Sequence, residues 1–203
     1  MSAADSLPPQ LDWGIAAQTL EGESVSGDTA VVVPANGTTL IAVIDGLGHG
    51  PEAASAASIA AQALRERAGD SLIRLVEHTH EALKRTRGVA MSLASFPADH
   101  DSMTWLGVGN VEGRLVHRQV RGHSMMLAGG VAGLELPRLR EATQSISKGS
   151  ILILATDGVR SDFADSFDWS GSPQEIADNI LQKHYRGTDD ALVLVARYLG
   201  DKA

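Results

Sequence analysis

The sequence predicts an α+β protein in which layers of antiparallel strands pack with a few helices. Three observations lead to this class. The chain begins with short apolar segments of strand character, continues with two long segments of helical periodicity, and then returns to short strands separated by glycine-rich turns before a last helix and strand. This order differs from the strict strand–helix alternation of parallel sheets. We therefore expect a sandwich built mainly from antiparallel strands.

Three strands are expected first, over residues 11–20, 29–34 and 38–44. Asn36 and Gly37 separate the second strand from the third, and this dipeptide is typical of a two-residue hairpin turn. The second and third strands should therefore pair with each other in antiparallel fashion.

Two helices are expected next. Pro51 can open the first helix because its missing N–H has no partner at that position anyway. The segment up to Arg67 is rich in good helix formers, and Gly69 ends it. The second helix should cover residues 71–86, where mostly apolar residues recur at helical spacing. Those residues are Leu72, Leu75, Val76, Thr79 and Leu83.

The rest of the chain should form strands, with one helix before the last of them. Ser172 is the expected N-cap of that helix, over residues 173–184. The expected strands cover residues 89–96, 102–108, 113–119, 124–127, 138–145, 150–156 and 191–199. We expect one domain over residues 11–203 and a flexible polar tail over residues 1–10.

The composition excludes several classes of function. The chain has 203 residues and a formal net charge of −8, so nucleic acid is not an expected partner. It has no cysteine, which excludes disulfides, thiolate metal sites and thiol catalysis. It has no apolar run near the ~20 residues that span a bilayer and no signal-peptide pattern at its start. We expect a cytoplasmic protein without membrane partners.

Acidic residues stand at the ends of four expected strands: Asp28, Asp45, Asp157 and the pair Asp189–Asp190. Each lies beside a glycine or another acid, and any one of them alone could be an ordinary turn residue. If these strand ends converge, the carboxylates would repel one another unless cations lie between them. Oxygen ligands without cysteine favour Mg²⁺ or Mn²⁺.

The turn after Asp45 fits this interpretation. Gly46 has no side chain, so its backbone can approach an ion and its carbonyl can act as a ligand. The segment Gly46–Gly50 is not a phosphate-binding loop of the nucleotide type, because it lacks both the glycine spacing and the lysine. His123 could equally be a turn residue or a neighbour of a metal or phosphate.

The order of these motifs resembles that of PP2C-type metal-dependent serine/threonine phosphatases, in particular the SpoIIE-like bacterial branch. The likeness extends from about residue 12 to residue 198, and the ordered set is specific although each motif alone is common. The motifs are Ser26–Asp28, Val43–Gly50, Gly107–Asn110, Gly122–His123, Ala155–Val159 and Thr188–Ala191.

The resemblance implies an αββα sandwich, with two antiparallel sheets face to face and helices outside. It also implies two Mn²⁺ or Mg²⁺ ions between the sheets, with Asp45 bridging them and Asn110 in support. The implied ligands are Asp28, Asp45, Gly46, Asp157 and Asp189, with Asp190 as the alternative to Asp189. The oligomeric state, the choice of metal and the phosphosite stay open.

The resemblance further implies hydrolysis of phosphoserine or phosphothreonine by a metal-activated water. The implied partners are phosphorylated STAS-domain proteins of a stressosome. Two alternatives stay open: a non-catalytic regulatory binding module, and a partner-switching phosphatase acting on an anti-sigma-factor antagonist. An acid is needed to protonate the leaving oxygen, and His49 and His123 are the candidates.

The sequence departs from the eukaryotic members in two places. Those members carry a phosphate-binding arginine just before the first acidic motif, whereas residues 19–28 contain no Lys or Arg. The segment between Gly130 and Pro137 is also short. We therefore expect an open site that binds free phosphopeptides weakly and suits a folded protein surface.

Overall fold

The structure is a computed structural model and describes residues 11–117, 120–164 and 169–200. The expected flexible tail over residues 1–10 lies outside the described residues. The strands are β1 (Leu11–Gln18), β2 (Asp28–Ala35), β3 (Thr38–Gly46), β4 (Val89–Pro97), β5 (Ser102–Val108), β6 (Glu112–His117), β7 (Val120–Ser124), β8 (Ala142–Ser145), β9 (Ile151–Ala155) and β10 (Ala191–Tyr198). The helices are α1 (Pro51–Glu66), α2 (Leu72–Leu83), α3 (Pro173–His184) and the 3-10 helix η1 (Ser161–Ala164).

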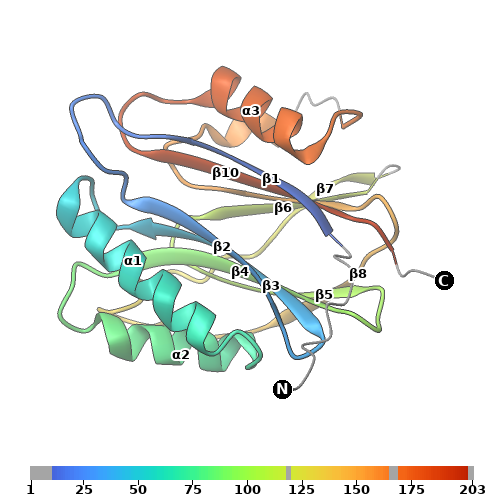
Figure 1. The fold of residues 1–203 in the computed structure, drawn as a ribbon, viewed down its shortest axis with the longest axis horizontal. Helices are drawn as coiled ribbons and strands as arrows, with labels where there is room; N and C mark the ends of the chain where they lie inside the picture. The colour runs from blue at the N-terminus through green and yellow to red at the C-terminus, as the bar shows by residue number, and fades with distance from the viewer. Residues whose placement is uncertain (1–10, 118–119, 165–168, 201–203) are drawn as a thin grey trace, which may run out of the picture.

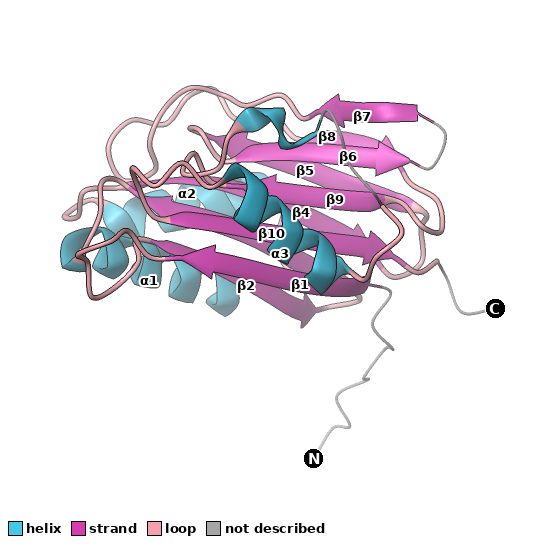
Figure 2. Ribbon diagram, turned by 90° about the horizontal axis from the view of Figure 1, so that it is seen from above, coloured by secondary structure: helices cyan, strands magenta, loops and turns pink. Residues whose placement is uncertain are grey.

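Two five-stranded antiparallel sheets stack face to face (Figure 1). The first has the strand order β1-β10-β9-β6-β7, and the second has the order β2-β3-β4-β5-β8. Helices α1 and α2 cover the outer face of the second sheet. Figure 2 shows α3 lying across the outer face of the first sheet, against β1 and β10. The predicted αββα sandwich is thus confirmed.

The β2–β3 hairpin forms as expected. Asn36 and Gly37 both have positive φ, 49° and 73°, as a two-residue turn of this kind requires. The turn sets the register, so that Ala35 lies opposite Thr38 and, at the far end of the hairpin, Asp28 lies opposite Asp45. A local turn signal therefore fixes where two acidic side chains meet.

Helix α1 approaches the end of β3 closely. Its buried face consists mainly of alanines, which let the helix backbone approach the strands. A methyl group added at Gly46, the last residue of β3, would overlap the carbonyl of Ala53 in the first turns of α1. The glycine is therefore needed for packing as well as for any role in the site.

The space between the sheets is filled by apolar side chains from both inner faces. Ile41 and Val43 of β3 belong to the same cluster as Leu154 of β9 and Leu194 of β10, and all four are almost completely buried. Trp105 fills the volume next to Gly113, where a side chain would overlap the indole ring. This core holds the two sheets in one fixed relation.

Several predicted boundaries differ from the structure. The short strand expected over residues 124–127 does not form: β7 ends at Ser124, and beyond it Met125 and Ala128 donate single backbone hydrogen bonds to Gly113 and Gly107. Strand β8 covers only residues 142–145 of the expected 138–145. Residues 118–119 of another expected strand lie outside the described residues, and η1 was not predicted.

Smaller shifts occur at the other ends of elements. β1 and the helices α1 and α2 end one to three residues earlier than expected. Ser172 caps α3 as predicted, and its side chain exchanges hydrogen bonds with Glu175 in a capping box. Among the described residues no helix combines the length and hydrophobicity needed to cross a membrane.

The packing of α3 on β1 gives a test of the fold. A methyl group at Gly14 would overlap the backbone of Gln174 in α3, so Gly14→Ala should destabilise the protein by about 1–3 kcal/mol through overpacking. The melting temperature should fall by about 2–4 °C for each kcal/mol. Gly129→Ala is the matched control, since open space surrounds that position. Equal melting temperatures for the two variants would contradict the described contact.

Candidate metal centre

The second sheet contributes two acids that face each other across neighbouring strands. Asp28 is the first residue of β2 and Asp45 is the last but one of β3, and the hairpin register places them directly opposite each other. The N–H of Gly46 donates to the carbonyl of Gly27 at 3.0 Å, which extends the ladder past the acids. The two carboxylates are therefore held by rigid backbone rather than by a loose loop.

The first sheet brings its acids to the same place. Asp157 follows the end of β9, and Asp189 precedes the start of β10. Thr156 connects the two sheets, because its hydroxyl donates to Asp28 Oδ2 at 2.7 Å and accepts from the N–H of Leu192 at 2.8 Å. The strand ends of both sheets thus converge, as the sequence suggested.

The structure assigns different surroundings to the two members of the Asp189–Asp190 pair. Asp190 is buried, and its two carboxylate oxygens accept the N–H groups of Leu20 and Gly27 at 2.8 and 2.7 Å. It therefore holds both ends of the loop between β1 and β2. Asp189 accepts the N–H of Asp190 through Oδ1 at 2.8 Å, and it is the better candidate of the two for binding an ion.

Asn110 lies next to the cluster, as the resemblance implies for a supporting residue. Its side-chain amide donates to Asp157 Oδ2 at 2.6 Å. Gly109 just before it has a φ of +91°, and a side chain there would overlap Ala90. The turn between β5 and β6 thus depends on this glycine to bring the amide to the carboxylate.

The carboxylates of the cluster destabilise one another's charged forms. Burial raises the pKa of Asp45 to about 8, and the charge of Asp28 adds to this effect. Burial likewise raises the pKa of Asp28 to about 7, although the hydrogen bond from Thr156 opposes the rise. Asp157, Asp189 and Asp190 contribute further repulsion to both. The cluster therefore favours either protons or cations.

The chemistry of this donor set fits a hard divalent cation. Carboxylate oxygens and a nearby backbone carbonyl are the ligands that Mg²⁺ and Mn²⁺ take in proteins. Within the described ranges, however, no three His, Asp or Glu side chains already surround a common point. The structure thus presents a converging acidic cluster whose side chains would have to close around an ion.

Two further polar contacts border the cluster, and neither was predicted. His49 is paired with Glu23 from the β1–β2 loop. Arg87, at the end of the connection from α2 to β4, pairs with Glu52 and reaches the turn at Gly48, where an added methyl group would lie 3.0 Å from its Nη1. Sequence spacing carries no signal for contacts between such remote segments.

His123 is the last of the proposed site residues. It lies on the edge strand β7, where its backbone pairs with that of Leu115 in β6. Its side chain is outside the described part of the chain, so its suggested role as a proton donor stays a prediction.

The two stacked antiparallel sheets with helices outside define a class of fold, that of the PP2C-type phosphatases. A family model described as "Stage II sporulation protein E (SpoIIE)" matches residues 35–199. The chain therefore belongs to the SpoIIE family. The family predicted from the order of the motifs is confirmed.

Three known proteins illustrate the relationship. The chain is 25% identical over 178 residues to the phosphoserine phosphatase RsbX of Bacillus subtilis (strain 168), covering 86% of this chain and 88% of that protein. A crystal structure of RsbX in complex with magnesium superposes with a TM-score of 0.82 at 23% identity, over 92% of this chain and 94% of the other. A chain from a study of the bacterial stressosome and secondary messenger signalling has a TM-score of 0.84 at 28% identity, over 92% and 99%.

The raised pKa values predict how the stability of the metal-free protein depends on pH. The pKa of Asp45 is 3.8 without the fold and about 8 within it, so the folded state binds more protons between these values. Stability in EDTA should therefore fall as the pH rises from about 4 to about 8 and should stay low above that. Thermal denaturation across this range measures the slope.

Asp45→Asn is the variant that isolates this effect, because it removes one of the repelling charges. Above about pH 8 it should melt about 2–4 °C higher than the parent protein, the shift that about 1 kcal/mol produces in a domain of this size. The exposed Asp12→Asn should leave the pH profile unchanged. A parent profile that is flat or rises with pH, or a fall that is as steep in Asp45→Asn as in the parent protein, would show that the acids do not repel.

Proposed function

We propose that the chain is a metal-dependent protein phosphatase that hydrolyses phosphoserine or phosphothreonine esters with a water activated by two Mn²⁺ or Mg²⁺ ions. The observation that carries this proposal is the half-buried cross-strand pair Asp28–Asp45, with Asp157 and Asp189 arriving beside it from the other sheet. Membership of the SpoIIE family supports it.

The residues of the chain would divide the work as follows. Asp28, Asp45, Asp157 and Asp189, with the carbonyl of Gly46, would hold the ions. When bound, a pair of divalent cations supplies a water of lowered pKa and neutralises the phosphoryl oxygens. Thr156 and Asn110 would keep two of the carboxylates oriented through the hydrogen bonds described above, as partners of metal ligands commonly do. Asp190 would act on the position of the loop rather than on an ion.

A role limited to binding a partner is less well supported. Burying several carboxylates next to one another costs stability, since each charge disfavours the next. A module that only docks on another protein gains nothing from this cost, whereas an ion-binding centre requires it. The charge balance of the cluster therefore favours catalysis.

We further propose that the substrates are phosphorylated STAS-domain proteins of a stressosome-like assembly. The relative RsbX is named a phosphoserine phosphatase, and one structural neighbour comes from work on the bacterial stressosome. The alternative within the same chemistry is an anti-sigma-factor antagonist in a partner-switching pathway. Initial rates on the two phosphoproteins, measured with the same enzyme and metal, distinguish them.

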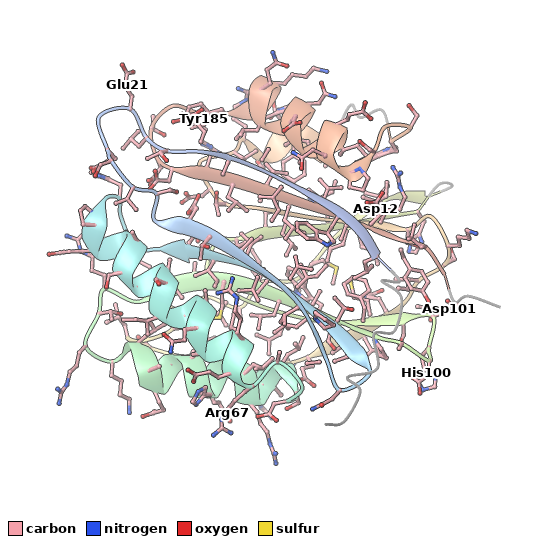
Figure 3. The ribbon with its side chains drawn as sticks, in the orientation of Figure 1. Asp12, Glu21, Arg67, His100, Asp101 and Tyr185 are labelled. Carbon is pink, nitrogen blue, oxygen red and sulfur yellow. The ribbon has the colours of Figure 1, made fainter. Side chains whose placement is uncertain are left out.

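Removal of the Asp45 carboxylate tests the reaction. Asp45→Asn should lower Mn²⁺-dependent hydrolysis of a phosphoserine peptide by at least about 100-fold. Mutation of residues that only hydrogen-bond to metal ligands already lowers activity by about 10–100-fold. EDTA should abolish turnover by the parent protein, and added Mn²⁺ should restore it. Asp12→Asn, at the opposite end of the sandwich from the β1–β2 loop (Figure 3), should keep the parent rate. Full activity of Asp45→Asn, or turnover unaffected by EDTA, would contradict the proposal.

A further inference from the structure

Three exposed basic side chains lie on two segments that adjoin the acidic cluster. Arg160 follows Asp157 by three residues, and Lys183 and Arg186 stand at the end of α3, shortly before Asp189. Together Arg160, Lys183 and Arg186 form a basic strip. The first sheet thus places positive charge next to the acids that it contributes to the candidate metal centre.

The two segments of the basic strip are joined through their backbones. Val159 and Tyr185 form an isolated antiparallel bridge. The N–H of Arg186 donates to the carbonyl of Gly158 at 2.9 Å. Arg186 is therefore tied to the residue that directly follows Asp157 in the sequence.

Two of the basic side chains are also held in place. Nη2 of Arg160 donates to the carbonyl of Lys183 at 2.8 Å, and its Nε lies 3.4 Å from Oδ1 of Asp162. Nε of Arg186 donates to the carbonyl of Val159 at 3.4 Å. Because these contacts already restrict both guanidinium groups, a partner that binds them loses less conformational entropy.

The basic strip keeps a net positive charge. Asp162 is the acid that pairs with Arg160, and it also accepts a hydrogen bond from the ring of His184. Within the described ranges, no acid forms an ion pair with Lys183 or Arg186. This local excess of positive charge lies on a chain whose formal net charge is −8.

The loop that carries Arg186 borders the acidic cluster. Burial raises the pKa of the neighbouring Tyr185, and the charges of Asp190 and Asp189 add to this rise. Figure 3 shows Tyr185 at the same end of the sandwich as Glu21 of the β1–β2 loop. A protein that presents a phosphorylated residue to the cluster would therefore also meet this loop.

The neighbouring β1–β2 loop has the opposite charge. It contains Glu21 and Glu23, and residues 19–28 include no Lys or Arg. Acidic side chains that approach the site would be repelled by this loop and attracted by the basic strip. The border of the site is thus polarised, and this polarity would orient an acidic partner.

We propose that the basic strip binds acidic side chains that flank the phosphorylated residue of a protein substrate; this inference rests on the phosphatase activity proposed above. Such side chains are repelled by the carboxylates of the site itself, so a positive border has its largest effect on substrates that carry them. Among its described contacts Arg186 uses Nε, which leaves its Nη groups for the two-point pairing that guanidinium forms with carboxylates.

Two peptides test the proposal: a phosphoserine with glutamates on both sides, and the same peptide with glutamines in their place. With Mn²⁺ present, Arg186→Gln and Lys183→Gln should each lower kcat/KM for the glutamate peptide by about 2–5-fold, the effect of one exposed ion pair. Arg186→Glu should lower it by about 10-fold, because attraction becomes repulsion. The losses should appear in KM, with kcat within about twofold of the parent value.

The glutamine peptide is the internal standard, and its kcat/KM should change by less than about twofold in every variant. About 1 M salt should abolish the preference of the parent protein for the glutamate peptide, since the Debye length is then about 3 Å. Arg74→Glu is the matched control, because Arg74 is exposed on α2 at the outer face of the other sheet. It should leave both peptides unaffected.

Melting temperatures verify that the variants fold, and if Arg186→Glu does not, the peptide ratios of the two glutamine variants decide. Equal losses on both peptides, or an unchanged preference for the glutamate peptide, would overturn the role of the basic strip while leaving the phosphatase proposal intact. A parent protein that hydrolyses neither peptide with Mn²⁺ would overturn the proposed function, and with it this inference. The two failures are therefore distinguishable.

Discussion

The candidate site depends on the mutual repulsion of a few half-buried carboxylates and on the framework that resists it. Asp28 and Asp45 would separate if their strands were free to move, but the hairpin register and the core between the sheets prevent this. The fold thus stores an unfavourable arrangement of charge at one end of the sandwich. Such strain is commonly found where a protein binds ions or carries out chemistry, because the ligand relieves it.

Hydrogen bonds from uncharged donors to these carboxylates make the arrangement possible. The hydroxyl of Thr156, at the end of β9, donates to Asp28 of the other sheet. The side-chain amide of Asn110, in the turn between β5 and β6, donates to Asp157. Asp190, although an acid, is stabilised by two backbone amides and orders the loop that carries Glu23. The cluster therefore has two kinds of member: acids that repel one another, and polar residues whose hydrogen bonds hold those acids and the nearby backbone in place.

Local patterns predicted much of the fold and of the candidate site. The Asn36–Gly37 turn, the helix start at Pro51 and the capping residue Ser172 are short-range signals, and each element forms near its expected place. The division of roles between Asp189 and Asp190 could not be predicted, since it depends on amides about 170 residues earlier in the chain. The contact of His49 with Glu23 and the course of residues 125–128 are likewise tertiary, so spacing along the sequence gave no indication of them.

The place of β10 within the first sheet has a consequence for biosynthesis. This strand, formed by residues 191–198, lies between β1 and β9 and provides a partner to both. During translation β1 emerges long before β10, and it has no neighbour in its sheet until residues 191–198 have also emerged. Assembly of that edge of the sheet must therefore wait for the synthesis of a remote segment, and such pairing is slow. A polypeptide terminated before β10 would lack the strand between β1 and β9 and, with it, the anchor that Asp190 gives to the β1–β2 loop.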